Sequence, residues 1–349
     1  MLSLLLRVLM LGLLGAPIYS QWVTQNVDTK ASFRGLSIVN DKIVWASGTG
    51  GTVIRTVDGG KTWKVMTVPG AEKLDFRDIE AFDANTAYIL SIGNGESSRI
   101  YKTTDGGVNW TLQFKNTDPK AFFDAMACWD RNNCIAMSDP VDGKFPLIST
   151  KDGGADWHPM DTSRMPPAKE REAAFAASGT CLITQGKTNA FLVTGGSAAR
   201  VFRSTDRGIS WTVADTPIVH GTAGSGIFSI AMYDDRNGAI AGGNYEKPLE
   251  ASANFAITKD GGRTWKIQGV PFGYRSAVIY GSKDTLYVVG PTGSDKSYDR
   301  GKAWSNMDRL SYNAVSAHGL DVVWAVGEKG MVANYPFLTK LFTVTPEKR

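Results

Sequence analysis

The residues of this chain best suited to chemistry are arginines and carboxylates that begin short apolar runs. They are Arg34, Arg77, Asp124, Arg171, Glu172 and Arg275. A guanidinium group binds a carboxylate through two parallel hydrogen bonds, so arginines that converge on one axis predict a site for an acidic ligand. The alternative is that Asp124 and Glu172 neutralise the arginines internally.

A second group of polar residues lies in stretches too polar and glycine-rich to be strands. These are Asp139, Asp142, Tyr245, Glu246, Lys247 and Asp295. Loops on a rigid scaffold often carry binding residues, and paired carboxylates there would supply general acid and base chemistry. The alternative is that these residues are solvated turn formers.

Composition excludes several classes of site. The chain has 349 residues and only 3 histidines, none with the His-x-x-x-His spacing of zinc proteases. Its 3 cysteines are too few for a four-cysteine zinc module. Without a Gly-x-Gly-x-x-Gly fingerprint or a Cys-x-x-Cys-His motif, we expect no metal and no cofactor. The net charge of +4 is small and dispersed, so we expect no nucleic-acid partner.

These candidates must be positioned by a repeated element. The pattern [Ser/Thr]-x-Asp-x-Gly-x-x-Trp occurs six times, and successive tryptophans lie 47, 47, 54, 54 and 39 residues apart. The aspartate and tryptophan pairs are Asp58 and Trp63, Asp105 and Trp110, Asp152 and Trp157, Asp206 and Trp211, Asp260 and Trp265, and Asp299 and Trp304.

A β-rich run stands before and after each copy, so each copy predicts a hairpin turn. The aspartate would accept hydrogen bonds from the turn's own N–H groups, and the tryptophan would bury apolar area beside it. The alternative is six calcium sites, but one carboxylate per turn supplies too few oxygen ligands.

Two further strands precede each copy, and seven strand starts can be counted. The starts are at Phe33, Phe76, Phe122, Arg171, Ile227, Tyr274 and Tyr312. The seventh unit has no copy of the pattern, and the segment 21–27 resembles the missing strand. We therefore predict an all-β fold, a single seven-bladed β-propeller of four-stranded blades over residues 21–340, closed by its N-terminal strand. The alternative is six blades with a C-terminal extension.

The first 20 residues read as a signal peptide, because a short apolar stretch ends in Gly15, Ala16 and Pro17. An uncleaved N-terminal anchor is the alternative. No second long apolar run follows, so we expect an exported protein, periplasmic or secreted, with no transmembrane segment in the mature chain. We also expect a monomer whose residues 341–349 form a C-terminal tail.

Export permits disulfides, and two cysteines have suitable spacing for one. Cys128 and Cys134 flank five residues that fit the tip of a hairpin, so we predict a bridge between them. Cys181 is then the odd cysteine, and we expect it to be a buried apolar residue.

The six copies resemble Asp-box, or BNR, repeats, which occur in sialidases, sortilin-type receptors and photosystem II assembly factors. The overall layout most resembles the photosystem II stability and assembly factor family. That resemblance implies a non-enzymatic scaffold that binds a protein, such as a membrane-protein partner, or another acidic ligand. In that family an arginine-rich face contributes, and here Arg34, Arg77, Arg171 and Arg275 would correspond to it.

The alternative resemblance is to a sialidase-like glycoside hydrolase. That chemistry needs an arginine triad, an aspartate acid and base, and a tyrosine activated by a glutamate. Tyr245 with Glu246, or Tyr274, would be the nucleophile. However, the first blade reads Phe33-Arg34-Gly35-Leu36 where sialidases carry an Arg-Ile-Pro-type motif.

Overall fold

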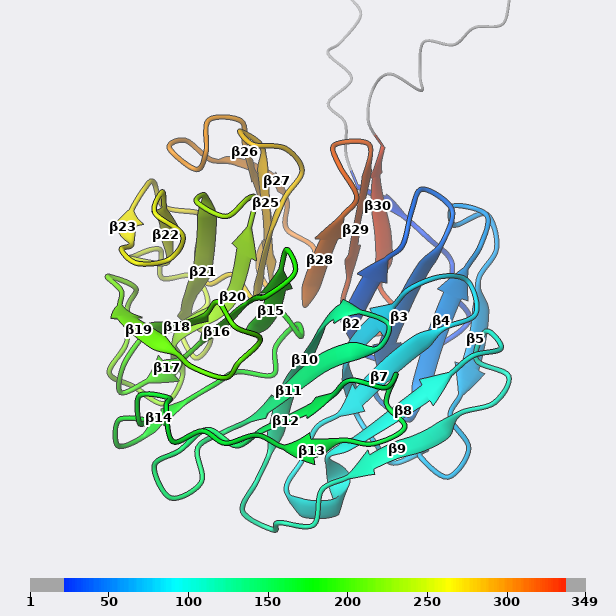
Figure 1. Cartoon of the computed structure of the whole chain (residues 1–349). Coiled ribbons are helices and arrows are strands. Elements are labelled where there is room, and N and C mark those ends of the chain that lie inside the picture. Colours follow the sequence, from blue (N-terminus) through cyan, green and yellow to red (C-terminus); the bar gives the residue numbers. More distant parts are fainter. Residues whose placement is uncertain (1–21, 337–349) are drawn as a thin grey trace, which may run out of the picture.

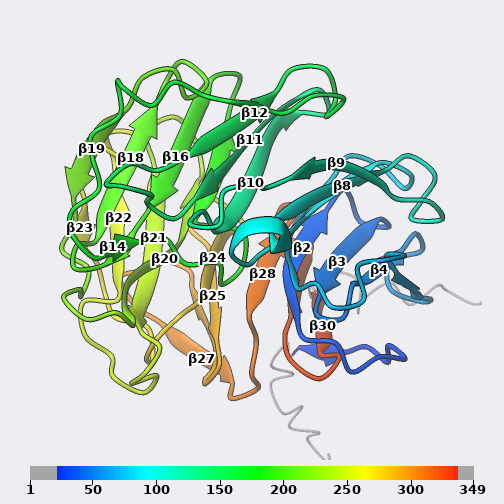
Figure 2. The ribbon, with the colours of Figure 1, turned by 90° about the horizontal axis from the view of Figure 1, so that it is seen from below.

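The computed structural model describes residues 22–336, which form seven four-stranded antiparallel blades in a ring (Figures 1 and 2). The prediction of a seven-bladed, all-β propeller is confirmed, and the six-bladed alternative is wrong. The predicted signal peptide, residues 1–20, and the predicted C-terminal tail, residues 341–349, both lie outside the described residues. No helix among residues 22–336 is long and apolar enough to cross a membrane.

The first three blades follow one another along the chain. Blade 1 contains β2 (Phe33–Ile38), β3 (Val44–Gly48), β4 (Thr52–Thr56) and β5 (Lys64–Thr67). Blade 2 contains β6 (Phe76–Ala81), β7 (Ala87–Ser91), β8 (Arg99–Thr103) and β9 (Thr111–Lys115), with a 3-10 turn, η1, over Gly95–Ser97. Blade 3 contains β10 (Phe123–Asp130), β11 (Asn133–Ser138), β12 (Leu147–Thr150) and β13 (His158–Pro159).

The other four blades complete the ring. Blade 4 contains β15 (Leu182–Gln185), β16 (Asn189–Val193), β18 (Arg200–Ser204) and β19 (Thr212–Asp215). Blade 5 contains β20 (Ser225–Met232), β21 (Gly238–Asn244), β22 (Phe255–Thr258) and β23 (Lys266–Ile267). Blade 6 contains β24 (Ala277–Tyr280), β25 (Leu286–Gly290), β26 (Gly293–Ser297) and β27 (Ser305–Asp308). Blade 7 contains β28 (Ala314–Ala317), β29 (Val322–Val326), β30 (Val332–Pro336) and β1 (Val23–Thr24).

The inner strands β2, β6, β10, β15, β20, β24 and β28 contact one another in that order, and β28 contacts β2. The ring is closed by β1, which pairs antiparallel with β30 through Val23 and Asn334. Trp22 anchors this strand, because its ring packs against Tyr312 and Tyr335 and its Nε1 donates to Ser294 Oγ at 2.9 Å. The closing strand is therefore held by side chains of both blade 6 and blade 7.

Each Asp box is a hydrogen-bonded turn. In all six boxes the aspartate Oδ1 accepts from the Ser or Thr hydroxyl two residues earlier, at 2.8–2.9 Å. The same hydroxyl accepts from the N–H of the second glycine position. Bonds from Thr62 and Asn109 lower the pKa of Asp58 and Asp105 to about 2, because they stabilise the charged carboxylates.

A bulge recurs near the start of the inner strands. The register shifts between Phe33 and Gly35, and at the corresponding pairs in β6, β10 and β20. The extra residues are Arg34, Arg77, Asp124 and Phe228. Because a bulge breaks the regular alternation of a strand, it re-aims one side chain, and here it does so at one end of the central channel. We call this end the mouth.

The fourth unit differs from its prediction. Its inner strand is β15, not a strand that starts at Arg171. Residues Glu172–Ala173 form β14 instead, which pairs with β17 (Gly195–Gly196), and β17 extends the sheet of blade 5. The cause is Glu172, whose carboxylate is buried against Arg200 and Thr194. These bonds hold the chain away from the inner ring until Leu182.

The predicted loop position of Asp295 is also wrong, because this residue lies within β26 and is fully buried. The turn before it is tight, since Gly290 pairs directly with Gly293. In blade 3, Cys128 and Cys134 lie opposite each other on β10 and β11 and are joined by a disulfide. Cys181 is a free, buried cysteine.

Three carboxyl groups are enclosed beneath the mouth. Asp78 accepts from the N–H groups of Ile79 and Met126, and Asp139 Oδ1 accepts from the Ala174 N–H at 2.8 Å. Burial raises the pKa of Asp78 to about 7, raises that of Asp139 to about 6, and raises that of Asp124 well above its ordinary value. The folded protein therefore holds protons here that the unfolded chain releases near pH 4.

We expect loss of the closing strand's anchor to destabilise the ring. Trp22→Ala should lower the free energy of unfolding by about 3–5 kcal/mol, as removal of a buried tryptophan does. Val23→Ala is the matched control, because Val23 is 48% exposed in the same strand and should change stability by less than about 0.5 kcal/mol. Urea denaturation measures both, and equal effects would contradict the anchoring role of Trp22.

We also expect an unusual pH dependence of stability. A raised native pKa stabilises the fold below the unfolded pKa, and this contribution is lost as pH rises through the native value. For Asp139 that window runs from about pH 4 to about pH 6. In the wild type, the free energy of unfolding should fall by on the order of 1–2 kcal/mol across this window because of Asp139, and Asp139→Asn should remove that fall. Asp142→Asn makes the same charge change at an exposed site and should keep the wild-type slope, and an unaltered slope in Asp139→Asn would count against burial as the cause.

Candidate functional site at the mouth of the ring

The mouth contains a hollow of about 350 Å³ where several predicted residues meet. Its wall includes Arg34, Arg77, Phe175, Phe228, Tyr245 and Tyr274. Arg34 and Arg77 come from the bulges of β2 and β6, so two adjacent blades present guanidinium groups to one space. Both arginines hold the same position within the repeat, which is why the structure brings them together.

A segment of blade 4's insertion lies against these arginines. Arg34 Nη1 donates to the Ala177 carbonyl at 3.0 Å, and Arg77 Nη1 donates to the Ala176 carbonyl at 3.1 Å. Arg77 also pairs with Asp75 at 2.7 Å. We call residues 174–181 the mouth segment. Its carbonyl groups satisfy part of the hydrogen-bonding capacity of each guanidinium but contribute no negative charge.

Arg34 is electrostatically the less satisfied of the two arginines. Burial lowers its pKa, the positive charge of Arg77 lowers it further, and Tyr274, Asp75 and Glu328 raise it by smaller amounts. Among residues 22–336, Arg34 forms no ion pair within 4 Å, whereas Arg77 has Asp75. Arg34 therefore carries a desolvation cost that no direct ion pair offsets.

Aromatic rings form the other side of the hollow. Phe175 stacks on Phe228 with ring centroids 3.9 Å apart, and Tyr274 meets Phe228 edge-on at 4.7 Å. Tyr245 caps the pair and is 48% exposed. The hollow thus combines two arginines and one carboxylate, that of Glu328, with an apolar surface. The arginines outnumber the carboxylate, which suits a ligand that has both an acidic and an apolar part.

Arg275 does not join the other arginines, although it also starts a repeat unit. Its side chain is fully buried and forms an ion pair with Asp295: Nε donates to Oδ2 at 2.8 Å, and Nη2 lies 2.6 Å from the same oxygen. Glu172 is likewise buried, paired with Arg200 at 2.5 Å. Arg171 is exposed with a positive φ of 59° and does not line the hollow.

The strand-start residue Asp124 and most of the predicted loop residues do not gather into one site. Asp124 is buried beneath the mouth, and Asp139 holds the mouth segment through Ala174. Asp142 is exposed and pairs with Lys120, and Lys247 pairs with Glu250. Glu246 is exposed in the loop after β21, and neither it nor Asp139 lines the hollow at the mouth.

Sequence reasoning named Tyr245 and Tyr274 but missed the stacked pair Phe175 and Phe228. Phe228 occupies the same bulge position as Arg34 and Arg77, so comparison of the strand starts could have found it. Phe175, Ala176 and Ala177 lie in an insertion that has no counterpart in the other repeat units. No sequence signal placed that insertion over the mouth.

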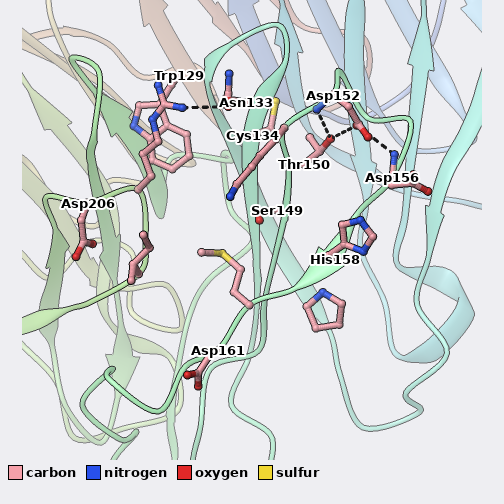
Figure 3. Close-up of a pocket in the computed structure, with 15 residues that line it drawn as sticks. Trp129, Asn133, Cys134, Ser149, Thr150, Asp152, Asp156, His158, Asp161 and Asp206 are labelled. Atoms are coloured by element: carbon pink, nitrogen blue, oxygen red, sulfur yellow. Dashed lines mark hydrogen bonds between the residues drawn. The ribbon is translucent and has the colours of Figure 1, made fainter.

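A second hollow of about 720 Å³ lies between the outer parts of blades 3 and 4 (Figure 3). Trp129, His158 and Asp206 are among the residues that line it. Its carboxylates are partly committed, since Asp152 accepts from the Thr150 hydroxyl and from the Asp156 N–H.

Comparison with known proteins supports the resemblance inferred from the boxes. A family model described as "Photosynthesis system II assembly factor YCF48" matches residues 15–120. No curated protein matches the chain significantly.

Two solved structures share the fold over nearly their whole length. One, described as YCF48 bound to D1 peptide, has 16% identity and a TM-score of 0.66, covering 91% of this chain and 98% of that one. The other, YCF48 from Cyanidioschyzon merolae, has 15% identity and a TM-score of 0.65, covering 90% of this chain and 99% of that one. The predicted resemblance to photosystem II assembly factors is therefore confirmed, by the family model over residues 15–120 and by the propeller fold over nine tenths of the chain.

Proposed function

We propose that this protein is a non-enzymatic binding scaffold that recognises an acidic segment of a partner protein at the mouth. The observation that carries the proposal is the pair Arg34 and Arg77, two guanidinium groups held 3.0 and 3.1 Å from neutral carbonyl groups in a hollow with an aromatic wall. A carboxylate would replace a dipole with a charge, and charge-assisted hydrogen bonds are roughly twice as strong as neutral ones.

The kind of partner follows from the shape and lining of the hollow. At about 350 Å³ it accommodates a few side chains and not a folded domain. Phe175, Phe228 and Tyr245 would contact an apolar side chain next to the carboxylate. A structurally similar protein is described as bound to a D1 peptide, which supports a peptide segment as the ligand here.

The test uses a fluorescein-labelled peptide that combines two aspartates with a phenylalanine, and a second peptide with asparagines in place of the aspartates. We expect the acidic peptide to bind more tightly in fluorescence polarisation, with affinity that falls as salt is added. Arg34→Gln and Arg77→Gln should each weaken it on the order of tenfold. Arg309→Gln, which removes an exposed arginine outside this hollow, should have little effect.

Two outcomes would overturn the proposal. One is equal affinity for the acidic and the amide peptide. The other is unchanged binding of the acidic peptide by the variant that combines Arg34→Gln and Arg77→Gln. Circular dichroism confirms that the variants fold, which we expect because both side chains are partly exposed.

We also propose that the protein is exported, to the periplasm or beyond, through its first 20 residues. The bridge between Cys128 and Cys134 supports this proposal, because disulfides persist in oxidising compartments. Protein isolated from cells should therefore contain one thiol, that of Cys181, which reacts with a maleimide only after unfolding.

The export prediction is checked by mass spectrometry after alkylation. Unfolded, unreduced protein should gain a single label, and reduced protein should gain three, since the chain has 3 cysteines. The mature N-terminus should fall near Gln21. Three labels without reduction, together with an intact residue 1, would show instead that the protein stays in a reducing compartment uncleaved.

A further inference from the structure

On the side that carries the Asp boxes, the junctions after blades 1 and 2 share one arrangement. In blades 1 and 2 a basic residue of the third strand stacks on an aromatic residue of the second and reaches the next blade. Arg55 lies 5.1 Å from the Trp45 ring and donates to the Ala84 carbonyl. Lys102 lies 5.2 Å from the Tyr88 ring and donates to the Gly153 carbonyl at 2.6 Å. Each of these junctions thus uses one cation on one backbone carbonyl.

Blades 3 and 5 lack this cation, and the box of the next blade carries an arginine instead. The paired positions hold Ile135 with Ser149 in blade 3, and Ala239 with Ile257 in blade 5. The following boxes carry Arg207 and Arg300 where other boxes have a glycine. Arg207 Nε donates to the Lys187 carbonyl of its own blade at 2.9 Å, and its Nη1 donates to Asn133 Oδ1 of blade 3 at 3.0 Å. Arg300 Nε donates to the Asp284 carboxylate of its own blade at 2.5 Å. Each of these two boxes thus brings one arginine to the first hairpin of its own blade.

The junction between blades 4 and 5 differs from these, because three arginines line one hollow there. Arg203 on β18 is the third-strand residue, paired with Phe191. Arg236, from the hairpin between β20 and β21, and Arg263, from the fifth box, line the same hollow of about 380 Å³. Among residues 22–336, none of these three arginines forms an ion pair within 4 Å.

The guanidinium of Arg203 is poorly satisfied. Its Nε is buried and has no hydrogen-bond partner, unlike the side chains of Arg55 and Lys102 at equivalent positions. Burial, and then the charge of Arg263, lower the pKa of Arg203. An unpaired donor of this kind costs free energy that a bound acceptor would recover.

The carboxylates nearby do not remove the surplus. Asp260 accepts from the Thr258 and Thr264 hydroxyls within its own box turn, and Asp235 is exposed. Three guanidinium groups against two carboxylates leave the hollow cationic. We propose that this hollow, on the far side of the ring from the mouth, binds a tetrahedral oxyanion, such as the phosphate or sulfate group of a small molecule or a lipid headgroup.

The test is calorimetric titration of the full protein with inorganic phosphate, at an ionic strength kept constant with sodium chloride. The variant that combines Arg236→Ala and Arg263→Ala should bind phosphate on the order of tenfold more weakly. Both side chains are exposed, so this variant should fold. Arg203→Lys, which keeps the charge but loses the planar fork, should give a smaller loss. Arg309→Ala should bind like the wild type.

A second arm distinguishes the sources of the oxyanion. If the wild type sediments with phosphatidylglycerol vesicles but not with phosphatidylcholine vesicles, and the double variant sediments with neither, the oxyanion belongs to a lipid headgroup. Phosphate binding without sedimentation assigns a soluble phosphate or sulfate. Absence of heat from the wild type at millimolar phosphate, or equal affinity of the double variant, overturns the proposal.

Discussion

Each blade of this propeller can bury both faces of its sheet only against its two neighbours, and every other feature depends on that constraint. A ring with one open junction would expose two apolar faces and two sheet edges. The chain meets the constraint with β1, a strand of only two residues, backed by Trp22. Trp22 packs in one cluster with Tyr287 of blade 6 and Tyr335 of blade 7, so side-chain packing and not strand length holds the ring closed.

The same constraint links residue differences between neighbouring repeat units. The glycine position of a box adopts a positive φ, which an arginine takes up at some cost; Arg207 has φ 60° and Arg300 has φ 64°. Both arginines occur where the preceding blade lacks its third-strand cation. Arg207 donates to the Lys187 carbonyl and Arg300 donates to the Asp284 carboxylate, each in the first hairpin of its own blade. A strained backbone position thus carries a cation where the preceding blade has none.

Much of the fold could be predicted from the sequence, because the box turn is local. A hydroxyl, a carboxylate and a glycine within five residues specify the hairpin, and six copies specify the blades. The positions of Arg34 and Arg77 could be predicted for the same reason, because both follow from their place within the repeat. That of Arg275 could not, since its burial depends on Asp295, which is 20 residues away and in a strand where a loop was expected. The position of the mouth segment could not be predicted either, because it is an insertion held by Asp139 of another blade.

The mouth segment decides what kind of ligand the mouth could accept. Its carbonyl groups already meet Arg34 and Arg77, so a neutral ligand would only exchange one dipole for another. A carboxylate gains a charge interaction at Arg34, which has no direct ion pair among the described residues, and this gain is reduced by Glu328, which lines the same hollow. The segment also supplies Phe175 to the aromatic wall, so its displacement would cost apolar contact. A ligand can bond the exposed N–H groups of the arginines while Phe175 stays stacked on Phe228. Such a ligand keeps both the charge interaction and the apolar contact. This favours an acidic group next to an apolar one over a purely acidic chain.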